Sequence, residues 1–146
     1  PNGGGAYGGT PNGELWSALA EKAYAQIGEM SWFGRQNSYS SIQYLYAYTT
    51  LGHITGQSTI GIAYTSGASS ESTFATACNA GKMICLITYA SPPLSGIVAN
   101  HAYAVLSYDA AAHTVTLYNP WGANYGLTTL SWSQVQQNFQ YFDRTA

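Results

Sequence analysis

The most informative stretch of the sequence is His101-Ala-Tyr-Ala-Val-Leu-Ser-Tyr108, followed by Val115-Thr-Leu-Tyr-Asn119-Pro-Trp-Gly122. Both segments begin as apolar runs typical of β-strands, and the chain between them is short enough for an antiparallel hairpin. With a turn near Ala110, residues pair where their numbers sum to about 220, so we expect His101 to lie opposite Asn119. Side chains alternate along strands, which places four apolar residues on the face of this pair: Tyr103, Val105, Val115 and Leu117.

A histidine held by an asparagine supplies the base and the orienting partner of a cysteine-protease site. The amide oxygen selects the ring nitrogen that carries the proton, and the other nitrogen can then accept a proton from a thiol. A histidine on a strand is more often structural, which is how we interpret His53 and His113, and an asparagine before proline is common in turns. For His101, the cross-strand Asn119 and the Pro-Trp-Gly after it favour a catalytic site.

Composition limits the classes of function. The chain has 146 residues, enough for one domain with a sizeable core, and its net charge of −2 gives no reason to expect a nucleic-acid partner. Only 7% of the residues are charged. The uncharged run over residues 83–108 is broken by Ser91-Pro92-Pro93 and Gly96, so we expect no membrane span. Two cysteines are too few for a disulfide framework, and we interpret Cys78 and Cys85 as buried structural thiols.

The N-terminal end reads as a linker. Residues 1–11 are rich in glycine, with Pro1 and Pro11 at their ends, and we expect residues 12–146 to form one subdomain. No signal peptide is recognisable, and the opening Pro1-Asn2-Gly3 is typical of the interior of a longer protein. Few charges and many Ser, Thr, Gly, Asn and Tyr residues favour an extracellular or bacterial surface protein, without deciding the location.

The remaining pattern predicts helices first and antiparallel strands after them, which is an α+β fold. The expected helices cover residues 14–27, 40–50, 70–79 and 132–139, and the expected strands cover residues 60–64, 82–89, 101–108, 114–118 and 140–144. The first helix has an apolar stripe at i, i+4 spacing: Leu15, Leu19, Ala23 and Ile27. We expect Gly52 and Gly81 to end the second and third helices. Ser131 and Gln134 have the spacing of a capping box.

Three segments of the chain carry a family likeness. Glu14-Leu-Trp-Ser-Ala-Leu-Ala-Glu-Lys-Ala-Tyr-Ala-Gln26 resembles the helix that opens the second half of the calpain protease core. His101-Ala-Tyr-Ala-Val105 and Asn119-Pro-Trp-Gly122 resemble the histidine and asparagine motifs of that family, in the same order. The closing helix and strand around Trp132 and Phe142 fit as well, so the likeness covers nearly the whole chain.

The resemblance implies a papain-like fold of the calpain type, in which an antiparallel sheet or open barrel has helices packed on one side. It implies that His101 is the general base and that Asn119 accepts a hydrogen bond from the imidazole. Pro120 would hold Asn119 in an extended conformation, and Trp121 would cover the His–Asn hydrogen bond and keep water from it. The implied substrate is a protein or peptide, bound in the cleft between this half and a second half.

The nucleophile of the family is not found in this sequence. In calpains the cysteine, and the glutamine of the oxyanion hole, precede the Glu-Leu-Trp-Ser helix, where this chain has only its glycine-rich segment. Neither Cys78 nor Cys85 matches the nucleophile position, because both follow that helix. We therefore expect a Cys-bearing protease half as the partner, in the same or a separate chain, and no activity from this chain alone.

Calcium is not expected either. Conventional calpains bind calcium in this half through acidic loops, one of which follows the Asn-Pro-Trp-Gly motif. Here no Asp or Glu occurs between Asp109 and Asp143, and calcium takes several oxygen ligands, usually with carboxylates among them. We expect no metal and no other cofactor.

The sequence therefore predicts the His/Asn half of a calpain-like cysteine endopeptidase. Two alternatives stay open: a non-catalytic protein-interaction module on the same scaffold, and a self-contained hydrolase that uses Cys78 or Cys85. A Gln and then Asp-Cys-Trp upstream of residue 1 would favour the protease. Two origins are compatible with a chain that contains one half of a protease core. It is either a processed product whose Cys-bearing partner stays associated or an isolated segment.

Overall fold

The computed structural model describes residues 16–28, 37–42, 45–63, 68–121 and 125–146. The chain divides into two compact units. The first comprises Pro1–Leu45 and Pro120–Gly126, and the second comprises Tyr46–Asn119 and Leu127–Ala146. The linker predicted over residues 1–11 lies outside the described residues.

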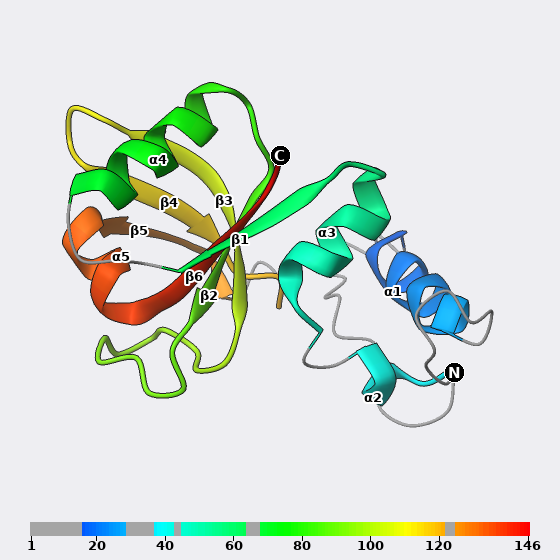
Figure 1. The fold of residues 1–146 in the computed structure, drawn as a ribbon. Helices are drawn as coiled ribbons and strands as arrows, with labels where there is room; N and C mark the ends of the chain where they lie inside the picture. Colours follow the sequence, from blue (N-terminus) through cyan, green and yellow to red (C-terminus); the bar gives the residue numbers. More distant parts are fainter. Residues whose placement is uncertain (1–15, 29–36, 43–44, 64–67, 122–124) are drawn as a thin grey trace. The chain divides into compact units, whose positions relative to one another are not determined.

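The second unit is built on one antiparallel sheet. The strands are β1 (Thr59–Ala63), β2 (Ile84–Thr88), β3 (Ala102–Asp109), β4 (Thr114–Tyr118), β5 (Leu127–Ser131) and β6 (Phe139–Thr145). Their order across the sheet is β1-β6-β2-β3-β4-β5, and every neighbouring pair is antiparallel (Figure 1). The predicted α+β class with an antiparallel sheet is confirmed, and the sheet is open. Within the described ranges, no helix has the length and apolar character needed to cross a membrane.

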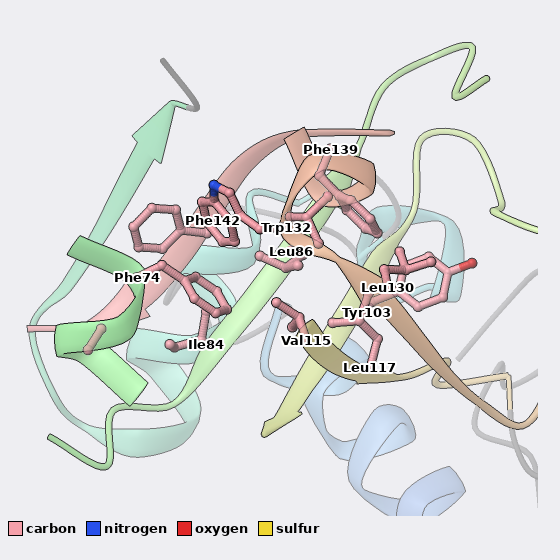
Figure 2. Packing of buried hydrophobic residues seen from close by; sticks show 12 residues of the cluster. Phe74, Ile84, Leu86, Tyr103, Val115, Leu117, Leu130, Trp132, Phe139 and Phe142 are labelled. Carbon is pink, nitrogen blue, oxygen red and sulfur yellow. The ribbon is translucent and has the colours of Figure 1, made fainter. Parts of the chain in front are cut away.

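Two helices pack on one face of this sheet and form the core with it. Phe74 and Ala77 come from α4 (Ala68–Asn79), and Trp132 and Val135 come from α5 (Trp132–Asn138). Figure 2 shows Phe74 and Trp132 packed together with Phe142 of the sheet. The ring centroid of Phe74 lies 5.1 Å from that of Trp132 and 5.5 Å from that of Phe142. Strand residues that complete the cluster are Ile84, Leu86, Tyr103, Val115, Leu117, Leu130, Phe139 and Phe142.

The capping box predicted before the last helix is confirmed. The Gln134 N–H donates to the Ser131 side chain at 3.3 Å, and the Ser131 N–H donates to the Gln134 side chain at 2.9 Å. Two N–H groups that would lack intrahelical partners are thereby satisfied, which explains how a helix as short as α5 begins sharply after β5. The third predicted helix also ends as expected, because Gly81 follows α4 with φ +66°.

The second predicted helix, over residues 40–50, is wrong, because the chain forms two helices there. Leu45 and Tyr46 are not helical, so α2 (Tyr39–Ile42) ends before them and α3 (Ala47–Thr55) begins after them. Gly52 lies inside α3, and Gly56 ends it with φ +68° and an N–H that donates to the Gly52 carbonyl at 2.8 Å. Gly52 serves packing instead, since a Cβ there would lie 3.2 Å from Thr59 Oγ1.

A carboxylate from β6 caps α3. The N-cap residue of α3 makes no side-chain cap bond, and the Tyr48 N–H donates to Asp143 Oδ2 at 2.8 Å. The positive end of the helix dipole favours a negative charge there. Phe142 points into the α4–α5 core, so its neighbour Asp143 points to the other face of the sheet. Gly61 leaves room for this contact, because a Cβ there would lie 3.0 Å from Asp143 Oδ1. The sheet therefore carries α4 and α5 on one face and is bonded to α3 through Asp143 on the other.

The first unit contains α1 (Trp16–Ile27) and α2. The apolar stripe predicted for the first helix is wrong: Leu19 is 59% exposed and Ala23 is exposed, whereas Ala25 is fully buried. The less exposed side follows Glu21, Ala25 and Gly28. A search for large apolar side chains at helical spacing does not detect this side, because its two buried residues are Ala25 and Gly28.

The predicted pairing of β3 with β4 needs a correction of two residues. Ala104 pairs with Tyr118 and Val105 with Leu117, so the numbers sum to 222 instead of 220. A bulge between Val105 and Ser107 shifts the register once more toward the turn. The apolar residues expected on one face do belong to the core or pack against it. Strand β5 is absent from the sequence prediction.

Candidate functional site

His101 and Asn119 flank the open end of the β3–β4 hairpin. His101 directly precedes β3 and Asn119 directly follows β4. In the observed register Asn119 falls opposite Tyr103, so His101 reaches it as a diagonal neighbour on the same face. The distance from His101 Nε2 to Asn119 Oδ1 is 3.0 Å. The contact predicted from the sequence therefore exists, although the pairing that was expected to create it is wrong.

The hydrogen bond decides which nitrogen of His101 can act as a base. An amide oxygen only accepts, so the bond requires the proton on Nε2. In the neutral ring the lone pair, and with it the basicity, is then at Nδ1. Asn119 is buried, with 4% of its surface exposed. The orienting bond is thus held away from bulk water on the asparagine side, where water would compete for it.

The surroundings of His101 keep its imidazole neutral. Burial lowers the pKa of His101 below the ordinary value, and the hydrogen bond to Asn119 opposes that shift without reversing it. The asparagine partner carries no charge, and its effect on the pKa of His101 is smaller than that of burial. A neutral imidazole with a fixed tautomer is the form that can accept a proton from a thiol.

Tyr103 braces the imidazole from the core side. Its ring meets the His101 ring edge-to-face, with 5.1 Å between centroids and 90° between planes. Tyr103 is 2% exposed, and its hydroxyl accepts a hydrogen bond from the Val98 N–H at 3.0 Å. A rigid, fully packed side chain therefore limits the rotation of the histidine. The sequence placed Tyr103 on the correct face and did not identify this role.

The two cysteines lie elsewhere and are poor nucleophiles. Cys85 pairs with Ala104 on β3, and Leu86 pairs with Tyr103, so Cys85 faces the side of the sheet opposite to Tyr103. Desolvation, with a contribution from the charge of Asp143, raises the pKa of Cys85 to about 11. Desolvation alone raises the pKa of Cys78 on α4 to about 11. Both remain protonated near neutral pH, and a thiol is far less reactive than a thiolate.

Pro120 and Trp121 belong to the first unit, and His101 and Asn119 belong to the second. Within the first unit, the Trp121 ring lies edge-on to Tyr125 with 5.1 Å between centroids. The structure thus brings together two of the four predicted site residues. The positioning role of Pro120 and the shielding role of Trp121 stay predictions.

Calcium ligands are not gathered in the part of the chain that the structure describes. No three or more His, Cys, Asp or Glu side chains come close enough there to hold a metal ion. Asp109 uses its Oδ1 within the β3–β4 turn, where it accepts from the N–H groups of Ala111 and Ala112 at 2.9 and 3.1 Å. The expectation of no metal and no other cofactor stays a prediction.

One residue of the site was missed by the sequence analysis. Thr88, at the end of β2, is fully buried and hydrogen-bonds to the backbone of His101. Thr88 lies in the apolar strand segment predicted over residues 82–89, and a single hydroxyl in such a segment gives no signal. Only the tertiary pairing of β2 with β3 reveals it.

Comparison with known proteins agrees with the geometry. The family model described as calpain family cysteine protease matches residues 6–145, which is almost the entire chain. No curated protein matches the chain at a significant level. Because the family match spans the sheet, its helices and both residues of the His101–Asn119 pair, the chain belongs to the calpain family of cysteine proteases.

Proposed function

We propose that this chain supplies the general base His101 and its orienting partner Asn119 to a cysteine endopeptidase whose nucleophile lies in a separate Cys-bearing half. The observation that carries the proposal is the 3.0 Å contact between His101 Nε2 and Asn119 Oδ1 in a half-buried site. The raised pKa values of Cys78 and Cys85 support the second part, because neither thiol ionises readily at neutral pH.

The proposed reaction uses the histidine twice. His101 Nδ1 takes the proton of the external thiol, and the thiolate attacks the carbonyl carbon of the scissile peptide bond. The imidazolium then returns the proton to the leaving amine, and a thioester joins the substrate's acyl group to the enzyme. Water attacks the thioester while Nδ1 takes its proton, and the carboxylic acid product leaves as the thiol is restored. Asn119 holds the ring in one tautomer throughout.

Pro120 and Trp121 have supporting roles in this proposal. Proline restricts the backbone of the residue before it, so Pro120 limits Asn119 to extended conformations. Trp121 keeps water from the hydrogen bond between His101 and Asn119 during turnover. We assign no step to calcium, because acid–base catalysis by an imidazole needs no metal and no Asp or Glu lies between Asp109 and Asp143.

The test combines this chain with a Cys-bearing calpain half and measures hydrolysis of a set of fluorogenic peptides. We expect hydrolysis that iodoacetamide abolishes, and a loss of about 100- to 10,000-fold in the His101→Ala variant. His113→Ala is the matched control, since His113 lies at the β3–β4 turn, and it should keep parental activity. Parental activity in His101→Ala would refute the proposal.

An assay of this chain without a second half tests the alternative functions. Iodoacetamide-sensitive hydrolysis without a second half would point to Cys78 or Cys85 as nucleophile and contradict the proposal. Substitution of both cysteines by alanine should leave the activity of the assembled protease unchanged. Tight association with the Cys-bearing half but no hydrolysis of any peptide would support a non-catalytic interaction module instead.

A further inference from the structure

The side chain of Thr88 holds the backbone of His101. The His101 N–H donates to Thr88 Oγ1 at 2.8 Å. The Thr88 hydroxyl has one proton, and it is placed to donate to the Val98 carbonyl at 2.8 Å, with the His101 carbonyl also within reach at 3.1 Å. Thr88 is fully buried. Its hydroxyl therefore joins the end of β2 to the segment that leads into His101, in a place where water does not compete.

The main chain of Thr88 completes this connection. The Thr88 N–H donates to the His101 carbonyl at 3.0 Å, so both polar backbone groups of His101 are bonded to Thr88. The regular pairing of β2 with β3 ends one residue earlier, where Ile87 pairs with Ala102. The hydroxyl thus takes the place of a ladder hydrogen bond at the end of the β2–β3 pair, directly before β3 begins.

A bulge in the neighbouring strand orients Thr88. Ile87 pairs with Tyr141 and Thr88 with Phe139, so Gln140 of β6 is left over between them. The Gln140 side-chain amide donates to the Thr88 carbonyl at 2.9 Å. Bulges are frequent beside active sites because they redirect a side chain without breaking the sheet. Here the bulge and the amide together fix the strand position from which the Thr88 hydroxyl acts.

The segment before His101 is held from a second side. The Val98 N–H donates to the Tyr103 hydroxyl at 3.0 Å, and its carbonyl accepts from Thr88. The ring of Tyr103 in turn packs edge-to-face on His101. Thr88 therefore holds the backbone of His101, and Tyr103 packs against its ring. Both side chains also bond to Val98 in the segment before it.

We infer that Thr88 is a positioning residue of the proposed site. By fixing the backbone of His101, it holds the imidazole against Asn119 before the thiol and the substrate arrive. This inference rests on the proposed function, because it assigns Thr88 a task only if His101 is the base. Misplacement of a catalytic group by about 1 Å lowers the rate by roughly 100-fold, so the loss of one hydroxyl should affect turnover more than substrate binding.

The test compares Thr88→Val with Thr145→Val in the protease assembled from this chain and a Cys-bearing half. Thr145 is the matched control: it is 2% exposed, lies in the same sheet, and its hydroxyl accepts the Met83 N–H at 3.2 Å. Thr88→Val should lower kcat by about 10- to 100-fold with KM changed less than about twofold. Thr145→Val should leave both unchanged, and Thr88→Ser should restore most of the rate.

Three results would overturn the inference: parental kcat in Thr88→Val, an equal loss in Thr145→Val, or a Thr88→Ser variant as slow as Thr88→Val. If Thr88→Val does not fold, Thr88→Ser against Thr88→Ala gives the same comparison with smaller side chains. A His101→Ala variant in the same series shows which idea has failed. Full activity without the histidine refutes the proposed function, whereas an inactive His101→Ala beside a fully active Thr88→Val refutes the role of Thr88 alone.

Discussion

Two histidines of the second unit are each bonded to a side-chain acceptor, and the acceptors differ in charge. His101 Nε2 lies 3.0 Å from the amide oxygen of Asn119, and His113 Nδ1 lies 2.7 Å from Glu71 Oε1 on α4. His101 is half-buried, whereas the side chain of His113 is 67% exposed. A neutral acceptor orients an imidazole and leaves it free of charge, while a carboxylate favours the imidazolium and forms an ion pair with it.

The His113 cluster has the properties of a structural connection. The Tyr108 hydroxyl also donates to Glu71 Oε1, at 2.7 Å, so one carboxylate joins α4 to β3 and to the β3–β4 turn. Desolvation acts to raise the pKa of Glu71, but the hydrogen bonds from Tyr108 and His113 and the charge of His113 lower it overall. Desolvation and the bond to Glu71, followed by nearby negative charges, raise the pKa of Tyr108 to about 12. These two bonds hold α4 against the β3–β4 hairpin, which is a structural task.

The largest expected difference between the two histidines concerns activity. In the assembled protease, His101→Ala should lose about 100- to 10,000-fold in kcat/KM because no group remains to take the thiol proton. His113→Ala should stay within about twofold of the parent and lose only a few tenths of a kcal/mol of stability, because exposed ion pairs contribute little. Peptide hydrolysis and urea unfolding of both variants measure this. Equal losses of activity would remove the distinction drawn between the two sites.

Substitution of Asn119, the acceptor of His101, tests whether the site needs an uncharged partner. Asn119→Ala removes the amide acceptor of the half-buried Nε2–H, which costs about 1–3 kcal/mol and corresponds to a roughly 5- to 150-fold lower kcat/KM. Asn119→Asp converts the site to the arrangement of His113 and Glu71, and an adjacent carboxylate should raise the pKa of His101. NMR titration of the imidazole measures that shift. An unchanged pKa in Asn119→Asp would show that residue 119 does not contact the ring.

Removing the charge of the second acceptor should affect stability alone. Glu71→Gln keeps the size of the side chain and removes the charge that both His113 and the Tyr108 hydroxyl contact, so we expect unfolding to become easier by about 1 kcal/mol. Thermal or urea unfolding measures the change, and peptide hydrolysis by the assembled protease serves as the control readout. A loss of kcat without a loss of stability would mean that the α4 cluster communicates with His101.

The smallest expected effect is the dependence of stability on pH. The pKa of His101 is lower in the folded state than its ordinary value, so the unfolded chain binds this proton more tightly. Stability from this group is therefore complete above the unfolded pKa, near 6.5, and is lost as the pH falls below it. Urea unfolding between pH 7.5 and 5.5 should show a smaller slope in His101→Ala than in the parent. The raised pKa of Asp143, which comes from desolvation, acts with the opposite sign in both proteins and cancels in the comparison.

Local chemistry explains which parts of this structure could be predicted. The capping box at Ser131 and the helix end at Gly81 depend only on residues a few positions away, so the local sequence is enough to predict both. The His101–Asn119 contact was predicted because two positions on the same face tolerate a shift of two residues in register. The bulge after Val105, which sets the register, has no such local signal.

The features that escaped prediction depend on distant parts of the chain. Thr88 matters because β3 happens to begin beside it, and Asp143 caps α3 although ninety-five positions separate it from Tyr48. The break at Leu45 and Tyr46 interrupts a segment whose helical spacing continues through it. In each case a tertiary contact overrides a local pattern, and one sequence without its fold contains no trace of that contact.

The place of β6 in the sheet has a consequence for how the protein is made. β6 lies between β1 and β2, so β1 is joined to the remainder of the sheet only through a strand that is synthesised about seventy-five residues later. During translation β2, β3, β4 and β5 can pair as each one appears, whereas α3 and β1 must wait until residues 139–145 have been added. Such late, long-range pairing slows folding and leaves the β2 edge exposed to other chains in the meantime. The six-stranded sheet is therefore completed only when β6 inserts between β1 and β2. A nascent chain that stalls before β6 already contains His101 and Asn119, but the sheet that positions them is incomplete.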